Sequence, residues 1–449
     1  MRPAMPPAME PHTTDMSDAP SSGLRRVVAN LLHLLGGKAV AGVISVIYLV
    51  IATHGLGARD YGVLLLVNAY AVFMGSLIAF SGYHGVVRYG AQALEAGDID
   101  GMARVVRFMA VVELGFGVAA IMLAALIVPF VGPRLGWSRG AMLLSVPYSF
   151  AVLATVRATP QGLLQLAGRF DLIGLHQAIS PTMRLIGATL VWLMGWGLTG
   201  FIAAWLAAAI VEGLAMWWLG MIAWRKLAEG RPLTGPWRGV TRERGGFGRF
   251  IIFTNLDLTL RELAPNLAPL TVGWLLGPAA AGLFGLAQRA TALLQQPATL
   301  LSQASYAVLA DQVAKRQFAL LRHTVWRGAA LAGAVAVAIV IALAFFGDHL
   351  MVLLGGRSFA GGWTLLILIA IGRIAALAAT PIAAGLTALG FPQRSMAVAL
   401  IANLALYPAL PLLLWWRGLD GAGWHGLIQN MVAFAVLAFF FAHDAKRAA

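Results

Sequence analysis

The sequence predicts an all-α polytopic membrane protein, and two observations support this fold class. Hydrophobic residues make up 60% of the chain and charged residues only 11%, whereas soluble domains carry about 25% charged residues. The apolar residues also form runs of roughly 20, the length that a helix needs to cross about 30 Å of hydrocarbon. Strands of a membrane β-barrel would be shorter and alternate in polarity, and these runs do not alternate.

We predict about twelve transmembrane helices from these runs. The predicted spans are residues 31–53, 62–83, 108–131, 140–158, 174–196, 199–222, 250–274, 282–304, 328–347, 363–386, 395–415 and 422–442. The organisation that we expect is a disordered N-terminal tail (1–24), an N-lobe (25–224), a cytoplasmic linker (225–246) and a C-lobe (247–449). The tail is rich in Pro, Met and Ser and lacks the apolar stretch of a secretory signal. An alternative is that translation starts further into the chain.

The distribution of basic residues predicts the orientation in the membrane. The net charge is +14, and about 20 basic residues lie on loops of one side against about 5 on the other. By the positive-inside rule the basic side is cytoplasmic, so both termini are expected there. This bias explains the positive charge without a nucleic-acid partner.

A weak internal repeat, with a nearly constant spacing between its copies, predicts two similar halves. Three motifs recur: Leu56-Gly57 with Gly62 as Leu276-Gly277 with Gly282, Ala158-Thr159-Pro160 as Ala379-Thr380-Pro381, and Gly197-Leu198 as Gly418-Leu419. About six spans separate equivalent positions, and an even number returns the chain to the same side. We therefore predict two parallel six-helix bundles around a central cavity, which could rock to give alternating access.

Charged side chains inside the predicted spans identify candidate site residues. A charge at the bilayer centre costs at least about 2.5–3.5 kcal/mol and needs a partner or water. The set is Lys38, Arg157, Arg184, Arg261, Arg289, Arg373, Glu113, Glu212, Asp257 and Glu262. Lys38, Glu113 and Arg289 lie nearer a span end, from which their charges could reach the headgroups. The excess of six bases over four acids fits an anionic substrate.

Polar stripes in these spans predict which side chains face a cavity. Arg184 and Arg373 have no acid on their own helix and are interpreted as cavity-lining. Arg289, Gln296 and Gln303 recur every seven residues and share one helix face, which should avoid lipid. The alternative for each stripe is hydrogen bonding between helices without a ligand.

The seventh span combines a predicted ion pair with a predicted hinge. Asp257 precedes Arg261 by four residues, a spacing that favours a local pair. Pro265 and Pro269 follow about one and two turns after Arg261, and each removes a backbone donor, so we expect a hinge there.

No catalytic motif is present in the sequence. It contains no Walker A motif, no HExxH, no nucleophile elbow and no ligand spacing for a metal. The segments between spans are too short for a separate catalytic domain, so we expect a protein that is not an enzyme and holds no metal or organic cofactor.

Three segments resemble the polysaccharide-biosynthesis, lipid-linked oligosaccharide (O-antigen type) flippases of the multidrug/oligosaccharidyl-lipid/polysaccharide exporter superfamily. They are LGARDYGVLLLVNAYAVF (56–73), which matches the family's LGxxxYG turn, and the regions 246–312 and 389–424. The resemblance implies translocation of undecaprenyl-diphosphate-linked oligosaccharide across the bacterial cytoplasmic (inner) membrane, for lipopolysaccharide O-antigen, capsule or exopolysaccharide assembly. It also implies H+ or Na+ coupling, and membrane lipid, a glycan polymerase and glycosyltransferases as partners.

This function assigns roles to the candidate residues. A cavity that supplies Arg forks for phosphate and amides for hydroxyls would lower the cost of burying the sugar headgroup. The predicted substrate cavity comprises Arg184, Arg289, Arg373, Arg261, Lys38, Gln288, Gln296 and Gln303. The predicted ion-coupling carboxylates are Glu262, Asp257, Glu212 and Glu113.

Three alternative functions stay open at this point. A drug/cation antiporter of the same superfamily would favour an acid-dominated cavity. An intramembrane glycan polymerase or ligase would usually need a large outer loop. A membrane scaffold would give no reason for arginines in the middle of helices.

Overall fold

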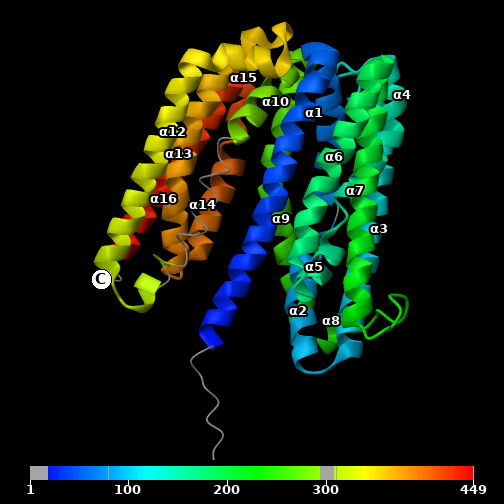
Figure 1. The fold of residues 1–449 in the computed structure, drawn as a ribbon, viewed down its shortest axis with the longest axis vertical. Coiled ribbons are helices and arrows are strands. Elements are labelled where there is room, and N and C mark those ends of the chain that lie inside the picture. The colour runs from blue at the N-terminus through cyan, green and yellow to red at the C-terminus, as the bar shows by residue number, and fades with distance from the viewer. Residues whose placement is uncertain (1–18, 79, 294–307, 310, 448–449) are drawn as a thin grey trace, which may run out of the picture.

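The computed structural model describes residues 19–78, 80–293, 308–309 and 311–447, and almost all of them are helical. The helices form two groups (Figure 1). The N-lobe contains α1 (Ala19–Ile78), α2 (Tyr83–Glu95), α3 (Ile99–Val131), α4 (Arg139–Tyr148), the 3-10 helix η1 (Ser149–Ala154), α5 (Ala158–Leu166), α6 (Phe170–Met194) and α7 (Gly197–Leu227). The short α8 (Val240–Glu243) follows. The C-lobe contains α9 (Phe247–Leu276), α10 (Pro278–Leu293), α12 (Phe318–Gly355), the 3-10 helix η2 (Arg357–Gly362), α13 (Trp363–Ala388), α14 (Pro392–Ala405), α15 (Ala409–Arg417) and α16 (Asp420–Arg447).

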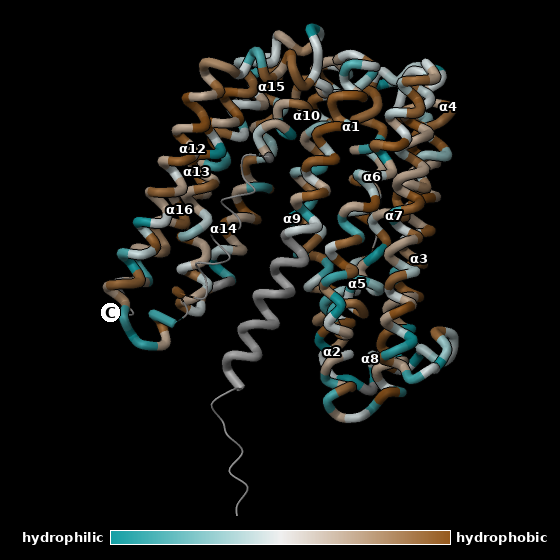
Figure 2. Tube along the Cα trace, in the orientation of Figure 1, coloured by the Kyte–Doolittle hydropathy of each residue, from teal (hydrophilic) through white to brown (hydrophobic). Residues whose placement is uncertain are grey.

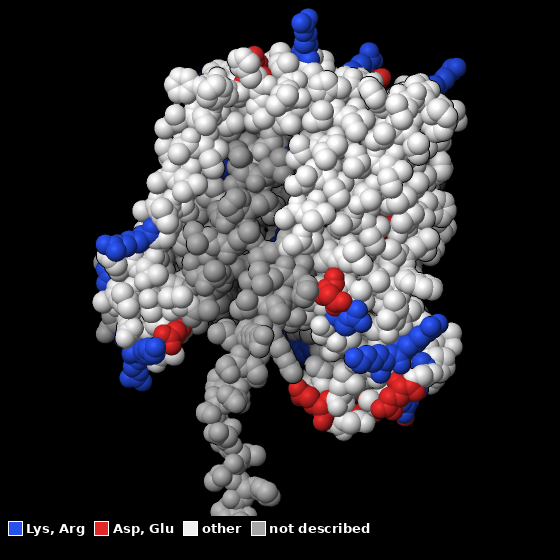
Figure 3. Space-filling view, viewed as in Figure 1, with Lys and Arg blue, Asp and Glu red and all other residues white. Residues whose placement is uncertain are grey.

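The helices have the length and hydropathy of membrane spans. Seven described segments meet both requirements, and α14 with α15, bent by 47°, would form an eighth. Helices α6 and α9, of 25 and 30 residues, are also long enough but carry more polar residues. Apolar residues cover most of the helix lengths (Figure 2), and charged side chains gather near the two ends of the molecule (Figure 3). The predicted all-α membrane fold is confirmed.

Each predicted span overlaps one helix or one broken helix pair, with differences where the backbone bends. The first two spans are both in α1, which begins inside the predicted tail and breaks at Gly57. The fourth is divided between α4 and η1, and the eleventh between α14 and α15. The span 282–304 is described only as far as Leu293.

The internal repeat is visible in the backbone itself. Gly57 has φ 70° and ψ 177° and Gly277 has φ 86° and ψ 175°, although they belong to different halves of the chain. Gly197 and Gly418, another pair from the repeated motifs, also share a positive φ of 57° and 60°. Side chains other than glycine rarely adopt such φ values. Two of the three motif pairs from which the repeat was predicted therefore mark equivalent turns, whereas Ala158-Thr159-Pro160 begins α5 and Ala379-Thr380-Pro381 lies within α13.

The two repeats meet each other through equivalent residues. A Cβ atom on Gly62 would overlap the carbonyl oxygen of Pro278, and a Cβ on Gly282 would overlap that of Ala58. Ala58 and Pro278 have the same separation along the sequence as Gly62 and Gly282, so the two contacts are reciprocal. Such a self-complementary contact is what a two-fold relation between the lobes produces.

Apolar packing joins the two lobes near these turns. Further from the turns, the apolar side chains form other clusters. One core cluster includes residues of both lobes, and within it the rings of Tyr61 and Phe359 lie 5.9 Å apart. Thr53 donates a hydrogen bond to the Leu354 carbonyl near the same turns. A second cluster belongs to the N-lobe and the start of α9, and a third to the C-lobe alone. This arrangement would let the lobes tilt about the shared cluster.

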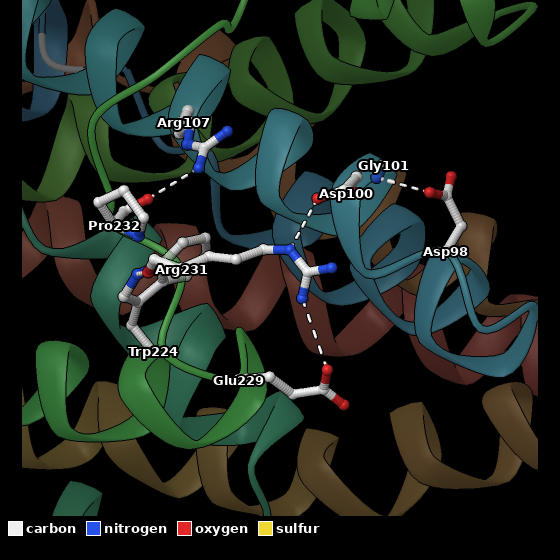
Figure 4. A network of polar contacts seen from close by, with 8 residues as sticks. All are labelled: Asp98, Asp100, Gly101, Arg107, Trp224, Glu229, Arg231 and Pro232. Atoms are coloured by element: carbon white, nitrogen blue, oxygen red, sulfur yellow. Dashed lines mark hydrogen bonds and ion pairs between the residues drawn. The ribbon is translucent and has the colours of Figure 1, made fainter.

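The segment after α7 packs against the N-lobe at the end of the molecule where α1 begins and the C-terminus lies (Figure 1). Arg231 forms an ion pair with Asp100 of α3 at 2.7 Å. Arg107 donates to the Pro232 carbonyl at 2.8 Å, and the Trp224 indole to the Arg231 carbonyl at 2.9 Å (Figure 4). These contacts hold the predicted linker on the N-lobe.

Candidate functional site

Two of the predicted cavity arginines meet at one tyrosine, although they come from different lobes. Arg289, on α10, donates a hydrogen bond to the Tyr48 hydroxyl of α1 at 3.0 Å. The guanidinium of Arg184, on α6, lies close to the same hydroxyl. Neither arginine forms an ion pair with any residue that the structure describes. Arg289 therefore points to the lobe boundary and not to the headgroups, so the suggestion that its charge snorkels was wrong.

Neutral groups hold Arg184 in place. Its Nη2 donates to Asn68 Oδ1 at 3.3 Å, and Asn68 also accepts from the Tyr148 hydroxyl at 3.0 Å. The guanidinium lies over the Trp205 ring, 4.6 Å from its centroid, in a cation–π contact. Its Nε is buried and has no hydrogen-bond partner within the described ranges. Among the described residues, Arg184 therefore has no carboxylate partner and one donor, Nε, that is not used.

A cavity of about 220 Å³ lies within the C-lobe, and we name it the C-lobe pocket. It is lined by Ala264, Pro265, Ala268, Phe284, Gln288, Ile369, Arg373, Asn403, Tyr407, Leu410, Ala422, His425, Gly426, Gln429 and Asn430. The Arg373 guanidinium, from α13, has no hydrogen bond or ion pair with the described residues. Arg373 and Gln288 therefore line a cavity within the C-lobe, whereas their predicted place in a central cavity between the bundles and their binding role stay predictions.

The polar wall of the C-lobe pocket depends on a helix break. Between α14 and α15 the chain bends by 47°, which frees backbone carbonyls. His425 of α16 lies 3.0 Å from one of them, that of Leu406. A carbonyl only accepts, so His425 Nε2 is the donor and must carry a hydrogen. Gln429 donates to Asn403, and the Tyr407 and Thr271 hydroxyls bond to each other.

Sequence reasoning missed five polar residues of this wall. They are Asn403, Tyr407, His425, Gln429 and Asn430. One signal could have identified part of the set: His425 and Gln429 are four residues apart in an apolar span, so they share a helix face. The residues of α14 and α15 give no regular stripe because the helix breaks between them.

The ion pair predicted in the seventh span is confirmed. Arg261 Nε lies 2.9 Å from Asp257 Oδ2 on α9, so Arg261 does not bring an uncompensated charge to a cavity. Glu262 is exposed, and its nearest polar partner, the Asn266 amide, is 3.5 Å away. Helix α9 runs unbroken through Pro265 and Pro269, and their hinge role stays a prediction.

The two N-lobe carboxylates are engaged in structural contacts. Glu113 is completely buried, so it cannot reach the headgroups, and the expectation that it snorkels was wrong. Its oxygens accept from the backbone N–H groups of Ala158 and Thr159 at 2.6 and 2.7 Å. It therefore caps the N-terminus of α5, where orphan donors and the helix dipole favour a negative charge. Glu212 pairs with Arg157 at 2.6 Å.

The remaining predicted residues add little to the site. Lys38 is exposed on α1. Gln296 and Gln303 lie outside the described residues. The predicted set thus separates into an interlobe group around Arg184 and Arg289 and a C-lobe group around Arg373. Basic side chains are visible in the hollow between the lobes (Figure 3).

Two bundles of membrane-length helices define the class of protein as a polytopic membrane protein. A family model described as polysaccharide biosynthesis protein matches residues 99–361. This chain belongs to that family. Family and fold together support a membrane exporter.

Similar proteins extend over most of the chain. The inner membrane protein YghQ of Escherichia coli (strain K12) is 26% identical over 355 residues, covering 76% of this chain and 96% of that protein. An inward-facing multidrug resistance MATE family transporter of the MOP superfamily has a TM-score of 0.66 at 17% identity, covering 92% of this chain and 95% of its own. A mutant of the Vibrio cholerae MATE transporter VcmN has a TM-score of 0.61 at 13% identity, covering 95% and 98%. These structures establish a MATE-like fold.

Proposed function

We propose that this protein is a flippase that carries undecaprenyl-diphosphate-linked oligosaccharide across the cytoplasmic membrane by alternating access. The family is one of polysaccharide biosynthesis, and the fold is shared with transporters. A relative is named for the inner membrane, and we assign this chain to the same membrane with both termini in the cytoplasm. The glycan would then serve O-antigen, capsule or exopolysaccharide assembly through glycosyltransferases and a polymerase.

The observation that carries the proposal is the meeting of Arg184 and Arg289 at Tyr48 without a counter-ion from the described residues. Both arginines are half-buried, and a cation without a counter-ion inside a membrane protein is costly, so the site is suited to an anion that supplies the missing charge. A diphosphate has the required charge and presents oxygens that match guanidinium forks. The polyprenyl tail would stay in lipid throughout.

Because the two arginines belong to different lobes, anion binding can be coupled to movement of the lobes. One belongs to each lobe, so a tilt of the lobes changes the distance between them. A ligand can shift a conformational equilibrium only if it binds the two states differently, and an anion held by both arginines meets this condition. The contacts around Gly57 and Gly277 close the end opposite the termini, so we propose that substrate enters from the cytoplasm.

Transport in proteoliposomes tests this function. Arg184→Gln and Arg289→Gln are each expected to lower the flipping rate of a fluorescent undecaprenyl-diphosphate oligosaccharide about 10- to 100-fold, because a hydrogen bond to a charged group contributes roughly 1.5–3 kcal/mol. Arg139→Gln, at an exposed arginine that begins α4, is the matched control. Normal rates in both test variants would overturn the site assignment.

We propose Glu262 as the first carboxylate to examine for H+ or Na+ coupling. Asp257 is paired with Arg261, Glu212 with Arg157, and Glu113 caps α5. Among the described residues, Glu262 has only a long contact to the Asn266 amide. Flipping should accelerate under an imposed ion gradient, and Glu262→Gln should remove that acceleration. A rate that ignores every gradient would remove the coupling proposal.

A further inference from the structure

The C-lobe pocket is separate from the Arg184–Arg289 pair and has its own chemistry. Its volume of about 220 Å³ is below the roughly 300–1,000 Å³ of sites for drug-sized ligands. A whole oligosaccharide exceeds that space, whereas a single sugar ring does not. Seven of its fifteen lining residues are polar or charged, although drug sites are predominantly apolar.

The charge of the lining predicts the charge of the ligand. Arg373 is the one arginine or lysine among the lining residues, and none of them is Asp or Glu. A cation would therefore be repelled, and a single negative charge would be balanced. A phosphate monoester carries close to two charges at neutral pH, so a carboxylate fits better. A planar guanidinium also binds a carboxylate through two parallel hydrogen bonds.

The other polar groups of the pocket suit ring hydroxyls. The side-chain amides of Gln288 and Asn430 have no hydrogen bond to the described residues, and each offers both donors and an acceptor. A hydroxyl needs both kinds of partner when it leaves water. Phe284, Ile369 and Leu410 supply an apolar surface beside them.

The repeat shows that this space is a property of the C-lobe. By the spacing that relates Gly197 to Gly418, Gly426 corresponds to Trp205 of the N-lobe. Trp205 is 1% exposed and is among the largest fully buried side chains described. Gly426 lines the C-lobe pocket, and a Cβ added there would meet no atom within 4 Å. The space that the Trp205 side chain fills in the N-lobe is therefore empty of side chain at the equivalent position of the C-lobe.

We propose that the C-lobe pocket binds one acidic sugar residue of the transported glycan, a ring that carries a single carboxylate. Its carboxylate pairs with Arg373, and its hydroxyls bond to Gln288 and Asn430. The pocket would then select glycans with an acidic sugar, while the Arg184–Arg289 pair holds the diphosphate. This inference rests on the proposed flippase function, but its ligand can be tested without transport.

Binding to the purified full-length protein in detergent provides that test. Methyl glucuronide is the probe, and methyl glucoside, acetate and inorganic phosphate are compared by titration calorimetry at millimolar concentrations. We expect glucuronide to bind at least about 10-fold more tightly than each of the others, given the energy of a charge-assisted pair. No glucuronide binding, or equal binding of acetate or phosphate, would overturn the proposal.

Two variants of different kinds keep this test specific. Arg373→Gln removes the charge, and Gly426→Leu fills the space with the charge unchanged. Each should weaken glucuronide binding at least about 10-fold, whereas Arg289→Gln should not. Normal glucuronide affinity in both pocket variants would overturn the proposal.

Flipping of matched lipids separates this inference from the proposed function. One lipid-linked sugar ends in glucuronate and the other in glucose. Arg373→Gln should slow the acidic lipid only. Glucuronide binding without flipping of either lipid would overturn the flippase and leave the pocket. Flipping of both lipids at rates unaffected by Arg373→Gln would overturn the pocket's role and leave the flippase.

Discussion

The two lobes repeat one helical arrangement, but at equivalent positions the interior of the N-lobe is filled by a side chain and that of the C-lobe is open. In the N-lobe, Trp205 fills the interior and supports Arg184, and Glu113 and Glu212 each have a close partner. In the C-lobe, Gly426 stands at the position equivalent to Trp205, and Arg373 faces a cavity with no partner among the described residues.

This difference indicates that the N-lobe interior serves mainly stability, whereas the C-lobe interior serves ligand binding. A filled interior stabilises a lobe through packing, whereas an open polar pocket costs stability and is expected where a ligand binds. We therefore expect N-lobe substitutions at these positions to lower stability, and C-lobe substitutions at the pocket to change ligand selection with little effect on stability.

The largest stability effect is expected at Trp205. Trp205→Ala leaves a cavity beside Tyr48 and removes the ring beneath Arg184, so the free energy of unfolding should fall by about 3–5 kcal/mol. Denaturant or thermal unfolding in detergent measures the change. Trp415→Ala, at a residue that is 87% exposed, is the control and should change stability little. Equal stability of the two variants would contradict the comparison.

The contact between the repeats is expected to give the next effect. Gly62→Ala places a Cβ against the Pro278 carbonyl, and backbone cannot move aside cheaply. We expect a loss of about 1–3 kcal/mol in the free energy of unfolding. Gly42→Ala is the control on the same helix, because a Cβ there meets nothing within 4 Å. The prediction fails if both substitutions are tolerated alike.

The Glu113 cap should contribute less. Glu113→Gln keeps the shape but loses the charge that accepts two backbone N–H groups at the start of α5. The expected cost is about 1–2 kcal/mol, in the range of a lost N-cap. Glu95→Gln, at an exposed position, should be neutral. If Glu113→Gln keeps full stability but loses gradient-driven transport, the residue couples ions and is not only a cap.

The smallest effect is expected for the Asp257–Arg261 pair. Both side chains are partly exposed, at 33% and 27%, and such pairs contribute about 1 kcal/mol or less. A double-mutant cycle with Asp257→Asn and Arg261→Gln measures the coupling energy. A coupling energy of several kcal/mol would show that the pair is desolvated and would contradict the expectation that it contributes little to stability.

Local sequence features predicted the fold well. Span length identified the helices, and the Leu-Gly motifs at 56–57 and 276–277 identified turns with nearly the same φ and ψ. The Asp257–Arg261 pair followed from its spacing alone. These features depend on a few neighbouring residues, so the sequence carries them directly.

The site was harder to predict because its contacts join distant parts of the chain. Tyr48 and Arg289 are 241 residues apart, and no periodicity links them. The C-lobe pocket exists partly because Gly426 has no side chain, and an absent side chain gives no polar signal. Glu113 was misjudged because its partners are backbone N–H groups of a later helix.

The central claim is that Arg184 and Arg289 together bind the diphosphate of the lipid carrier. Binding of a short-chain polyprenyl diphosphate without sugar to the purified protein tests it most directly, since the C-lobe pocket is then not involved. We predict that Arg184→Gln and Arg289→Gln each weaken this affinity about 10- to 100-fold, while Arg373→Gln leaves it unchanged. Affinity that is unchanged in both interlobe variants, or lost only in Arg373→Gln, would contradict the account.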